Sequence, residues 1–311
     1  VVGGIRLRVD AATPQAEGHV VIDQPTLWSP DSPFLYDLEA SLETDTGAVD
    51  RITSYFGMRK ISLGKDEAGI TRLLLNNKEL FQLGPLDQGY WPDGLYTAPT
   101  DEALRYDIEI TKQLGFNMTR KHVKVEPDRW YYWTDKLGLL VWQDMPSGDA
   151  RIAPGFPDIK RSAQSARQFE TELTSLVQGL HNHRSIVHWG VFNEGWGQYD
   201  TKRLTDYTKS LDPSRLVISA SGWTDRKTGD IHDIHHYPAP KSPEAEQARA
   251  VVNGEYGGLG LPVEGHTWQG KDNWGYQQFK TVDELVAKYA DFIDRVHILR
   301  GKPGMSAAVY T

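Results

Sequence analysis

The first part of the chain alternates apolar with polar positions at a period of two. Residues 5–9 and 36–42 show this alternation, which is typical of β-strands with one buried face. Prolines and the Asp-Thr-Gly stretch at 45–47 separate these segments as turns. We therefore predict a small immunoglobulin-like β-sandwich over residues 1–63, a length that is short for a complete sandwich.

From about residue 70 the pattern changes to short apolar segments separated by amphipathic stretches. The apolar segments predict eight strands, at 80–86, 116–119, 139–142, 186–192, 216–219, 231–235, 251–253 and 305–309. Helical spacing predicts helices over 104–114, 130–137, 169–180 and 282–299. Pro127 is placed for the first turn of the second helix, and the capping box Thr281-x-x-Glu284 opens the last.

This alternation predicts an α/β fold, a (β/α)8 TIM barrel over residues 64–311. The competing topology is a doubly wound open sheet. It needs a glycine-rich, phosphate-binding turn after the first strand, and the Leu-Gly-Pro-Leu-Asp segment at 83–87 is not one. The number of strands favours the barrel.

Composition excludes several classes of protein. A net charge of −8 argues against a nucleic-acid partner. The sequence contains no run of about 18 apolar residues, so we predict no membrane span. With no cysteine, disulfides, thiolate metal sites and a Cys nucleophile are excluded. No signal peptide is visible, so we expect a soluble protein of cytoplasmic, periplasmic or secreted location, and the oligomeric state stays open.

Aromatic residues make up 11% of the chain and include ten Trp. Several stand beside Gly, Asp, Asn or Pro in predicted loops, at 90–94, 221–223 and 273–275. Aromatic rings in such loops suit sugar rings, which stack on them through their C–H faces. Anchoring of long loops onto a barrel explains any single Trp equally well.

Two carboxylates follow apolar strands directly, where a barrel enzyme carries its catalytic groups. Glu194 follows the strand at 186–193, and Glu255 follows 251–254. Glycoside hydrolysis needs one carboxyl as acid and an opposed carboxylate, and configuration is retained when the two lie about 5–5.5 Å apart. Asn193 is placed to bond a sugar 2-hydroxyl. A Glu that only caps a helix or pairs with Arg is the alternative for either residue.

Four segments, at 56–61, 116–120, 133–142 and 181–194, resemble glycoside hydrolase family 2, which holds β-galactosidases, β-glucuronidases and β-mannosidases. The resemblance implies that Glu194 is the acid/base and Glu255 the nucleophile. It also implies that the chain is a fragment holding part of the sandwich and the catalytic barrel. The predicted substrate-binding set joins residues implied by the resemblance to strand-end and loop residues: Asn193, Arg120, His122, Asp87, His236, Tyr237, Trp223 and Trp268.

The chain departs from the family at two strand ends. Lys121–Pro127 replaces the common Thr-Ser-His-Tyr-Pro pattern, so His122 is shifted by one position. The third strand ends with the single acid Asp144, so we predict no metal site and no required cofactor, with Mg²⁺ or Na⁺ unsupported. Lys271-Asp272-Asn273 does not match the Asn-x-Lys carboxylate clamp of glucuronidases, which favours a neutral sugar such as galactose.

We therefore predict a retaining, exo-acting β-glycosidase whose partner is a carbohydrate. One rival is the same chemistry on β-glucuronides or β-mannosides, and another is a non-catalytic carbohydrate-binding or inactive homologue. The third is a metal-dependent hydrolase using His232, His235 and His236, but their alternation lets at most two face inward.

Overall fold

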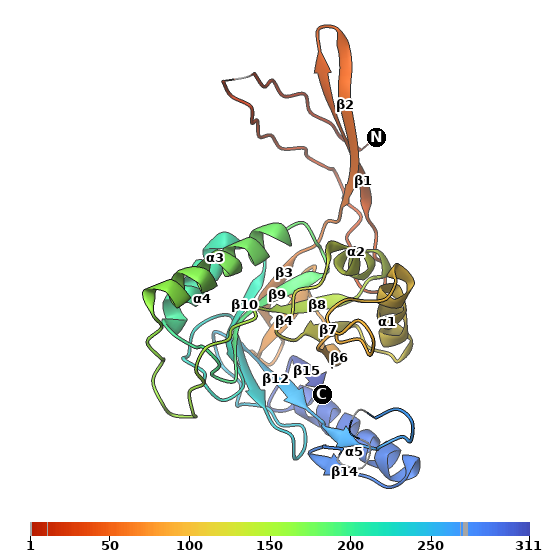
Figure 1. Ribbon diagram of the computed structural model, residues 1–311, viewed down its shortest axis with the longest axis vertical. Coiled ribbons are helices and arrows are strands. Elements are labelled where there is room, and N and C mark those ends of the chain that lie inside the picture. Colours follow the sequence, from red (N-terminus) through yellow and green to blue (C-terminus); the bar gives the residue numbers. More distant parts are fainter. Residues whose placement is uncertain (1, 11, 268, 270–272) are drawn as a thin grey trace.

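The computed structural model describes residues 2–10, 12–267, 269 and 273–311. Eight parallel strands form one sheet that curves into a nearly closed barrel (Figure 1). In chain order they are β6 (Gln82–Asp87), β7 (Met118–Lys121), β8 (Leu140–Asp144), β9 (Ile186–Asn193), β10 (Leu216–Ser221), β11 (Ile231–His235), β12 (Ala250–Tyr256) and β15 (Ala307–Tyr310). The predicted barrel is confirmed, and each of the eight strands predicted for it overlaps an observed one.

Closure of the barrel occurs at two places. The first strand, β6, pairs with both β7 and the last strand, β15. Between β10 and β11 the backbone N–H of Asp230 donates to the carbonyl of Val217 at 2.9 Å. The eight strands therefore follow one another around the barrel in the order of the chain, from β6 to β15.

Helices cover the outside of the barrel: α1 (Asp101–Gln113), α2 (Asp128–Leu137), α3 (Ala163–Gly179), α4 (Thr201–Leu211) and α5 (Val282–Gly301). Helix α4 was not predicted, because its buried face is built largely from threonines rather than aliphatic residues. Thr205 and Thr208 donate their hydroxyls to carbonyls four residues earlier, so these polar side chains are satisfied inside the helix.

Capping explains where several helices begin. The predicted capping box at Thr281 and Glu284 is present at the start of α5. Pro127 takes the N-cap position of α2, one residue before the predicted first turn, and Gly138 ends that helix with a left-handed φ of 79°. These local signals fix the lengths of the helices between the strands.

The barrel has an inner and an outer hydrophobic core. The outer core joins α1–α4 to the outward faces of β8–β10. The inner core includes Trp142, Val187 and Ile231, and it continues below the barrel into β3 (Ile61–Lys65) and β4 (Thr71–Leu75). These two strands and β5 (Lys78–Glu79) form a small antiparallel sheet. Because the amino-terminal end of the barrel is covered, the opposite end is free for chemistry.

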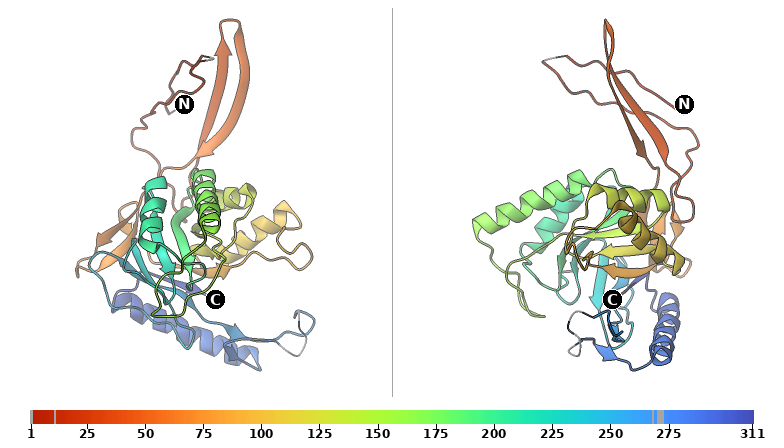
Figure 2. Two further views of the ribbon diagram at one scale, coloured as in Figure 1. Left: turned by 60° about the vertical axis from the view of Figure 1, so that its left-hand side comes forward. Right: turned by 45° about the vertical axis from the view of Figure 1, so that its right-hand side comes forward.

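The amino-terminal strands project from the barrel as a small sandwich-like part (Figures 1 and 2). They form an antiparallel hairpin of β1 (Tyr36–Thr44) and β2 (Gly47–Phe56). The predicted strand at 5–9 is wrong: this segment is extended but forms no ladder, and its apolar side chains are exposed. Alternation alone does not make a strand where no described neighbour supplies backbone partners. The proposed division at residues 63 and 64 falls within β3.

A short parallel pair, β13 (Leu259–Gly260) and β14 (Gln277–Gln278), lies beside α5. None of the helices in the described ranges combines the length and the apolar character needed to cross a lipid bilayer.

Candidate active site

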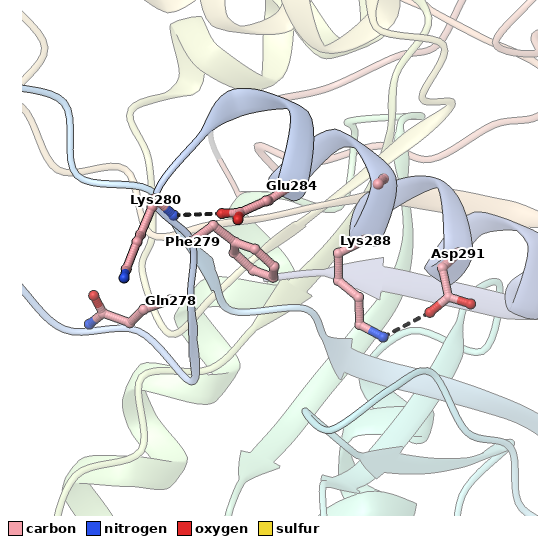
Figure 3. Close-up of a pocket in the computed structure, with 7 residues that line it drawn as sticks. Gln278, Phe279, Lys280, Glu284, Lys288 and Asp291 are labelled. Atoms are coloured by element: carbon pink, nitrogen blue, oxygen red, sulfur yellow. Dashed lines mark hydrogen bonds and ion pairs between the residues drawn. The ribbon is translucent and has the colours of Figure 1, made fainter.

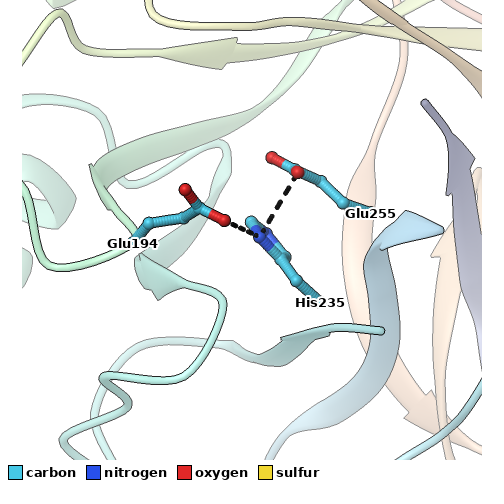
Figure 4. Close-up of side chains that lie close together, drawn as sticks. All are labelled: Glu194, His235 and Glu255. Atoms are coloured by element: carbon cyan, nitrogen blue, oxygen red, sulfur yellow. Dashed lines mark hydrogen bonds and ion pairs between the residues drawn. The ribbon is translucent and has the colours of Figure 1, made fainter. Parts of the chain in front are cut away.

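Two glutamates meet at the carboxyl-terminal end of the barrel strands. Glu194 follows β9 directly, and Glu255 lies near the end of β12. Each offers a carboxylate oxygen, and these oxygens and a ring nitrogen of His235 all lie within 4.8 Å of one another. His235 Nδ1 lies 3.0 Å from Glu194 Oε1 and 3.4 Å from Glu255 Oε2 (Figure 4). Two acids far apart in sequence therefore share one imidazole.

The backbone at Glu194 is in an unusual conformation. Its φ is +52°, a left-handed value that a non-glycine residue adopts at a cost. The conformation is held because the Glu194 N–H donates to the Ser221 carbonyl at 2.9 Å, and Gly195 continues the turn with a φ of 76°. This turn ends β9 and aims the Glu194 side chain across the barrel mouth.

A β-bulge positions Glu255. Ile234 pairs with Asn253 while the next residue, His235, pairs with Glu255, so Gly254 is the extra residue on β12. A Cβ at Gly254 would lie 2.0 Å from Asp233 Oδ2, so no side chain fits at this position. The Gly254 N–H instead donates to Asp233 Oδ1. The bulge thus requires glycine and places Glu255 opposite His235.

Arg120 connects the floor of the site. Its guanidinium is fully buried and donates to Asp144 Oδ2 at 2.8 Å, to Asn193 Oδ1 at 2.8 Å and to Glu255 Oε1 at 3.2 Å. Burial alone would lower the pKa of Arg120, but the carboxylates of Asp144 and Glu255 raise it above its usual range. The cation is therefore permanent and holds Glu255 in place.

Tyr237 and His122 complete the surroundings of Glu255. The Tyr237 hydroxyl donates a hydrogen bond to Glu255 Oε2. Asn193 accepts from Arg120 through Oδ1, so its amide nitrogen faces His122 Nε2 at 3.2 Å. His122 Nε2 also lies 3.7 Å from Glu255 Oε1. The shifted register of His122 therefore still brings its imidazole to the site.

Burial separates the protonation states of these groups. Burial raises the pKa of the Glu194 carboxyl, although Arg151 and Arg120 nearby act in the opposite direction. Burial also lowers the pKa of His235 to about 3 and that of His122 to about 4. Both imidazoles are consequently neutral near pH 7, and Glu194 keeps its proton to a higher pH than an exposed glutamate.

A buried chain of hydrogen bonds extends behind His235. The Ser221 hydroxyl lies 2.7 Å from His235 Nε2 and also bonds Asp233 Oδ2. Burial raises the pKa of Asp233 to about 7, against the opposing effect of Arg120. When Glu194 is protonated, it can donate to His235, His235 can donate to Ser221, and Ser221 can donate to an ionised Asp233. With Glu194 ionised, the whole chain can reverse and Asp233 holds the proton.

Two family models match the chain. The family model described as "Glycosyl hydrolases family 2, TIM barrel domain" matches residues 71–263, and "Glycosyl hydrolases family 2" matches residues 5–59. The first of these covers more than half of the chain. The chain belongs to glycoside hydrolase family 2.

The family 2 relatives are longer than this chain. A beta-galactosidase of Lactococcus lactis is 29% identical over 66% of the chain and 20% of its own length. A putative beta-glucuronidase of Formosa agariphila is 26% identical over 89% of the chain and 25% of its own length. The solved beta-D-glucuronidase of Dictyoglomus thermophilum has a TM-score of 0.74 at 16% identity, over 94% of this chain and 53% of that one. The chain thus spans a fifth to a quarter of these two curated relatives.

Of the other residues predicted to bind substrate in this family 2 chain, some lie at the barrel mouth and others do not. Asp87 ends β6 at the mouth, where Lys121 Nζ lies 2.6 Å from its carboxylate. Trp223 packs edge-on against His235, with ring centroids 5.8 Å apart. The His236 ring bonds the carbonyl of Ala239 instead of reaching either carboxylate, so it fixes its own loop. Trp268 lies outside the described residues.

Sequence reasoning identified the two strand-end acids and several of their neighbours, but it gave His235, Ser221 and Asp233 no role in a glycosidase site. The period of two along β11 places Asp233 and His235 on the same face, and this signal could have found them. Sequence reasoning selected His236 instead, as one of the residues at the end of this strand.

The histidines do not converge as the metal-hydrolase alternative requires. His232 lies beside Glu246 and Asp225, away from the carboxylate pair. Asp144 is bonded to Arg120, so it acts as the partner of a cation. In the described part of the chain, the group able to share a metal ion is Glu194, His235 and Glu255.

A separate hollow along α5 carries none of these groups (Figure 3). Three of its charged residues are engaged locally, since Lys288 Nζ lies 2.8 Å from Asp291 and Glu284 caps the helix. We therefore place the chemistry at the barrel mouth.

Proposed function

We propose that this chain carries the catalytic centre of a retaining β-glycosidase, with Glu194 as acid/base and Glu255 as nucleophile. The observation that supports this most is the approach of the two carboxylates, whose nearest described oxygens lie within 4.8 Å. Retaining glycosidases need a separation of about 5–5.5 Å, whereas inverting enzymes need about 6.5–9.5 Å to accommodate a water.

In the first step Glu255 attacks the anomeric carbon while the bond to the leaving oxygen breaks. Glu194 gives its proton to that oxygen, so the leaving group departs as a neutral alcohol and a glycosyl ester forms on Glu255. In the second step Glu194, now a carboxylate, removes a proton from water. The water oxygen bonds to the anomeric carbon, Glu255 is released, and Glu194 regains its proton.

The surroundings suit these roles. Arg120 and Tyr237 both donate to Glu255, and these hydrogen bonds hold its carboxylate in position for attack. Burial raises the pKa of Glu194, which favours the protonated form that donates. Neutral His235 can serve either protonation state of Glu194 by exchanging its tautomer. This scheme uses no cofactor.

The proposed substrate is a terminal β-linked sugar, with a β-galactoside favoured. The Lactococcus relative and one from Enterobacter cloacae are named beta-galactosidases, and the Lys-Asp-Asn order at 271–273 differs from the Asn-x-Lys clamp. β-Glucuronides are the second candidate, since the Formosa relative and several similar structures are named beta-glucuronidases.

The test combines hydrolysis with covalent trapping. The chain is incubated with 4-nitrophenyl β-galactoside, β-glucuronide and β-mannoside, and then with the 2-deoxy-2-fluoro analogue of the sugar it hydrolyses. We expect release of 4-nitrophenol and one label, on Glu255, in the digested protein. Glu172→Gln, which removes an exposed charge on α3, is the matched control and should label normally.

Hydrolysis with a label elsewhere would overturn the assignment of Glu255. Sugar binding without hydrolysis or label would instead support a non-catalytic carbohydrate-binding protein.

A further inference from the structure

We propose that Arg151, together with Trp196 and Trp223, forms a leaving-group subsite that selects a sugar carrying an anionic substituent, a carboxylate or a sulfate. This inference rests on the proposed function, because it needs Glu194 to be the acid that serves the leaving group. The inference concerns the leaving-group side of the glycosidic bond, which the family assignment does not define.

The loop that carries Arg151 is tied to the turn at Glu194. Arg151 and Trp196 form an antiparallel bridge, and the Ile152 N–H donates to the Gly195 carbonyl at 3.0 Å. The Gly197 N–H donates to the Ala150 carbonyl at 2.9 Å. Arg151 Nε itself donates to the Glu194 carbonyl at 3.3 Å. The guanidinium is thus held beside the acid/base by backbone contacts.

Two indoles flank this guanidinium. Its central carbon lies 5.8 Å from the ring centroid of Trp196 and 5.4 Å from that of Trp223. Such distances allow cation–π attraction, which keeps the long side chain in place. The indoles remain 45% and 37% exposed, so each presents apolar ring surface to solvent. Exposed indoles next to a cation combine stacking with charge recognition of a sugar.

The position of this group identifies the side of the glycosidic bond that it serves. The Glu255 side chain is only 4% exposed, whereas that of Glu194 is 21% exposed, so the site opens outward past Glu194. The acid/base protonates the leaving oxygen and therefore stands where the leaving group departs. Arg151 and its two indoles extend from this outer side, so they face the leaving group rather than the sugar that is cleaved.

Arg151 forms no salt bridge with any of residues 2–10, 12–267, 269 and 273–311, although acidic residues outnumber basic ones in the chain. Its Nε–H donates to the Glu194 carbonyl, and within these residues its other N–H groups have no partner, so they can bind a planar anion such as a carboxylate or sulfate.

A simpler role for Arg151 would be electrostatic. Its charge opposes the rise in the pKa of Glu194, so removing it would change the pH dependence of the reaction. That effect would be the same for every leaving group or acceptor. A binding role instead depends on the charge of the partner sugar, and this difference separates the two explanations.

Transglycosylation tests the subsite, because an acceptor that intercepts the glycosyl-enzyme must bind where the leaving group was. The chain is given the 4-nitrophenyl glycoside that it hydrolyses fastest, with methyl β-D-glucoside, methyl β-D-glucuronide or methyl β-D-glucoside 6-sulfate as acceptor. We expect at least one anionic acceptor to be used about fivefold more efficiently than the neutral one at low salt, with the preference weaker at high salt. The better of the two identifies carboxylate or sulfate.

Arg151→Gln should remove the preference, and Arg167→Gln, an exposed arginine on α3, should retain it. Equal use of all three acceptors by the wild type, or an unchanged preference in Arg151→Gln, would overturn the subsite. Absence of 4-nitrophenol release from every donor would count against the proposed function instead. In that case NMR titration with the same three methyl glycosides still decides whether the chain binds anionic sugars through Arg151.

Discussion

The Nδ1 atom of His235 lies 3.0 Å from a carboxylate oxygen of Glu194. Burial keeps this imidazole neutral, so it can donate to the ionised carboxylate or accept from the protonated one. An acid/base must pass through both states in each catalytic cycle, and the same neighbour can stabilise both. Ser221 and Asp233 extend the contact into the barrel wall.

Replacement of either glutamate should lower turnover by several orders of magnitude without unfolding the protein. The two variants should differ in how azide rescues them with an activated 4-nitrophenyl glycoside. In Glu255→Gly azide replaces the nucleophile and should give a glycosyl azide of inverted configuration. In Glu194→Gly azide attacks the glycosyl ester on Glu255 and should give a product of retained configuration. NMR of the products measures this, and the same configuration from both variants would contradict the assignment.

The descending limb of the pH–rate profile should belong to Glu194. Its pKa is raised by burial, so the carboxyl is protonated and active below that pKa and loses its proton as pH rises through it. Glu194→Gln should lose this limb when a 4-nitrophenyl glycoside is used, because that leaving group needs little acid assistance. The measurement is kcat/KM against pH for both proteins. A limb that persists unchanged in the variant would assign it to another group.

Asp233 should make the folded state less stable as pH rises. Its carboxyl has a pKa of about 7 when folded and an ordinary value of 3.8, so the folded state holds the additional proton between these values. The contribution of Asp233 to the free energy of unfolding is fully present below about pH 4 and is lost as pH rises to about 7. Asp233→Asn lacks this loss, so its free energy of unfolding relative to wild type should increase between pH 4 and pH 7.

Urea unfolding at several pH values measures that difference. Asp206→Asn, an exposed residue on α4, is the control and should run parallel to wild type. A constant difference between Asp233→Asn and wild type would contradict the raised pKa.

A buried ion pair below the barrel should be important for stability. Arg215 and Asp212 are both fully buried, and Arg215 also donates to the carbonyls of Ile186, His181 and His183. Arg215→Met leaves the Asp212 carboxylate and these carbonyls without the cation, and should lower the free energy of unfolding by about 3–5 kcal/mol.

The pair of Arg203 with Glu170, which is partly open to solvent, offers a control. Arg203→Met should cost less than about 1 kcal/mol, because solvent screens this pair. Chemical denaturation measures both variants, and equal losses would contradict the difference that burial is expected to make.

The barrel could be predicted from the sequence because its strands are buried on both faces and appear as continuous apolar runs. Helix α4 could not, because threonines that bond their own helix replace its apolar stripe. The strand at 5–9 failed for the opposite reason: its alternation is present, but no described strand pairs with it.

The positions of Glu194 and Glu255 could be read from the sequence, because a polar residue at the carboxyl end of a buried strand emerges at one end of the barrel. Their neighbours could not be read in this way, because these come from other strands. His235 and His236 are adjacent in the chain, yet one bonds Glu194 and the other bonds the Ala239 carbonyl. Side chains alternate along a strand, and the β-bulge at Gly254 shifts the pairing, so contacts across the barrel depend on register, which composition and spacing do not contain.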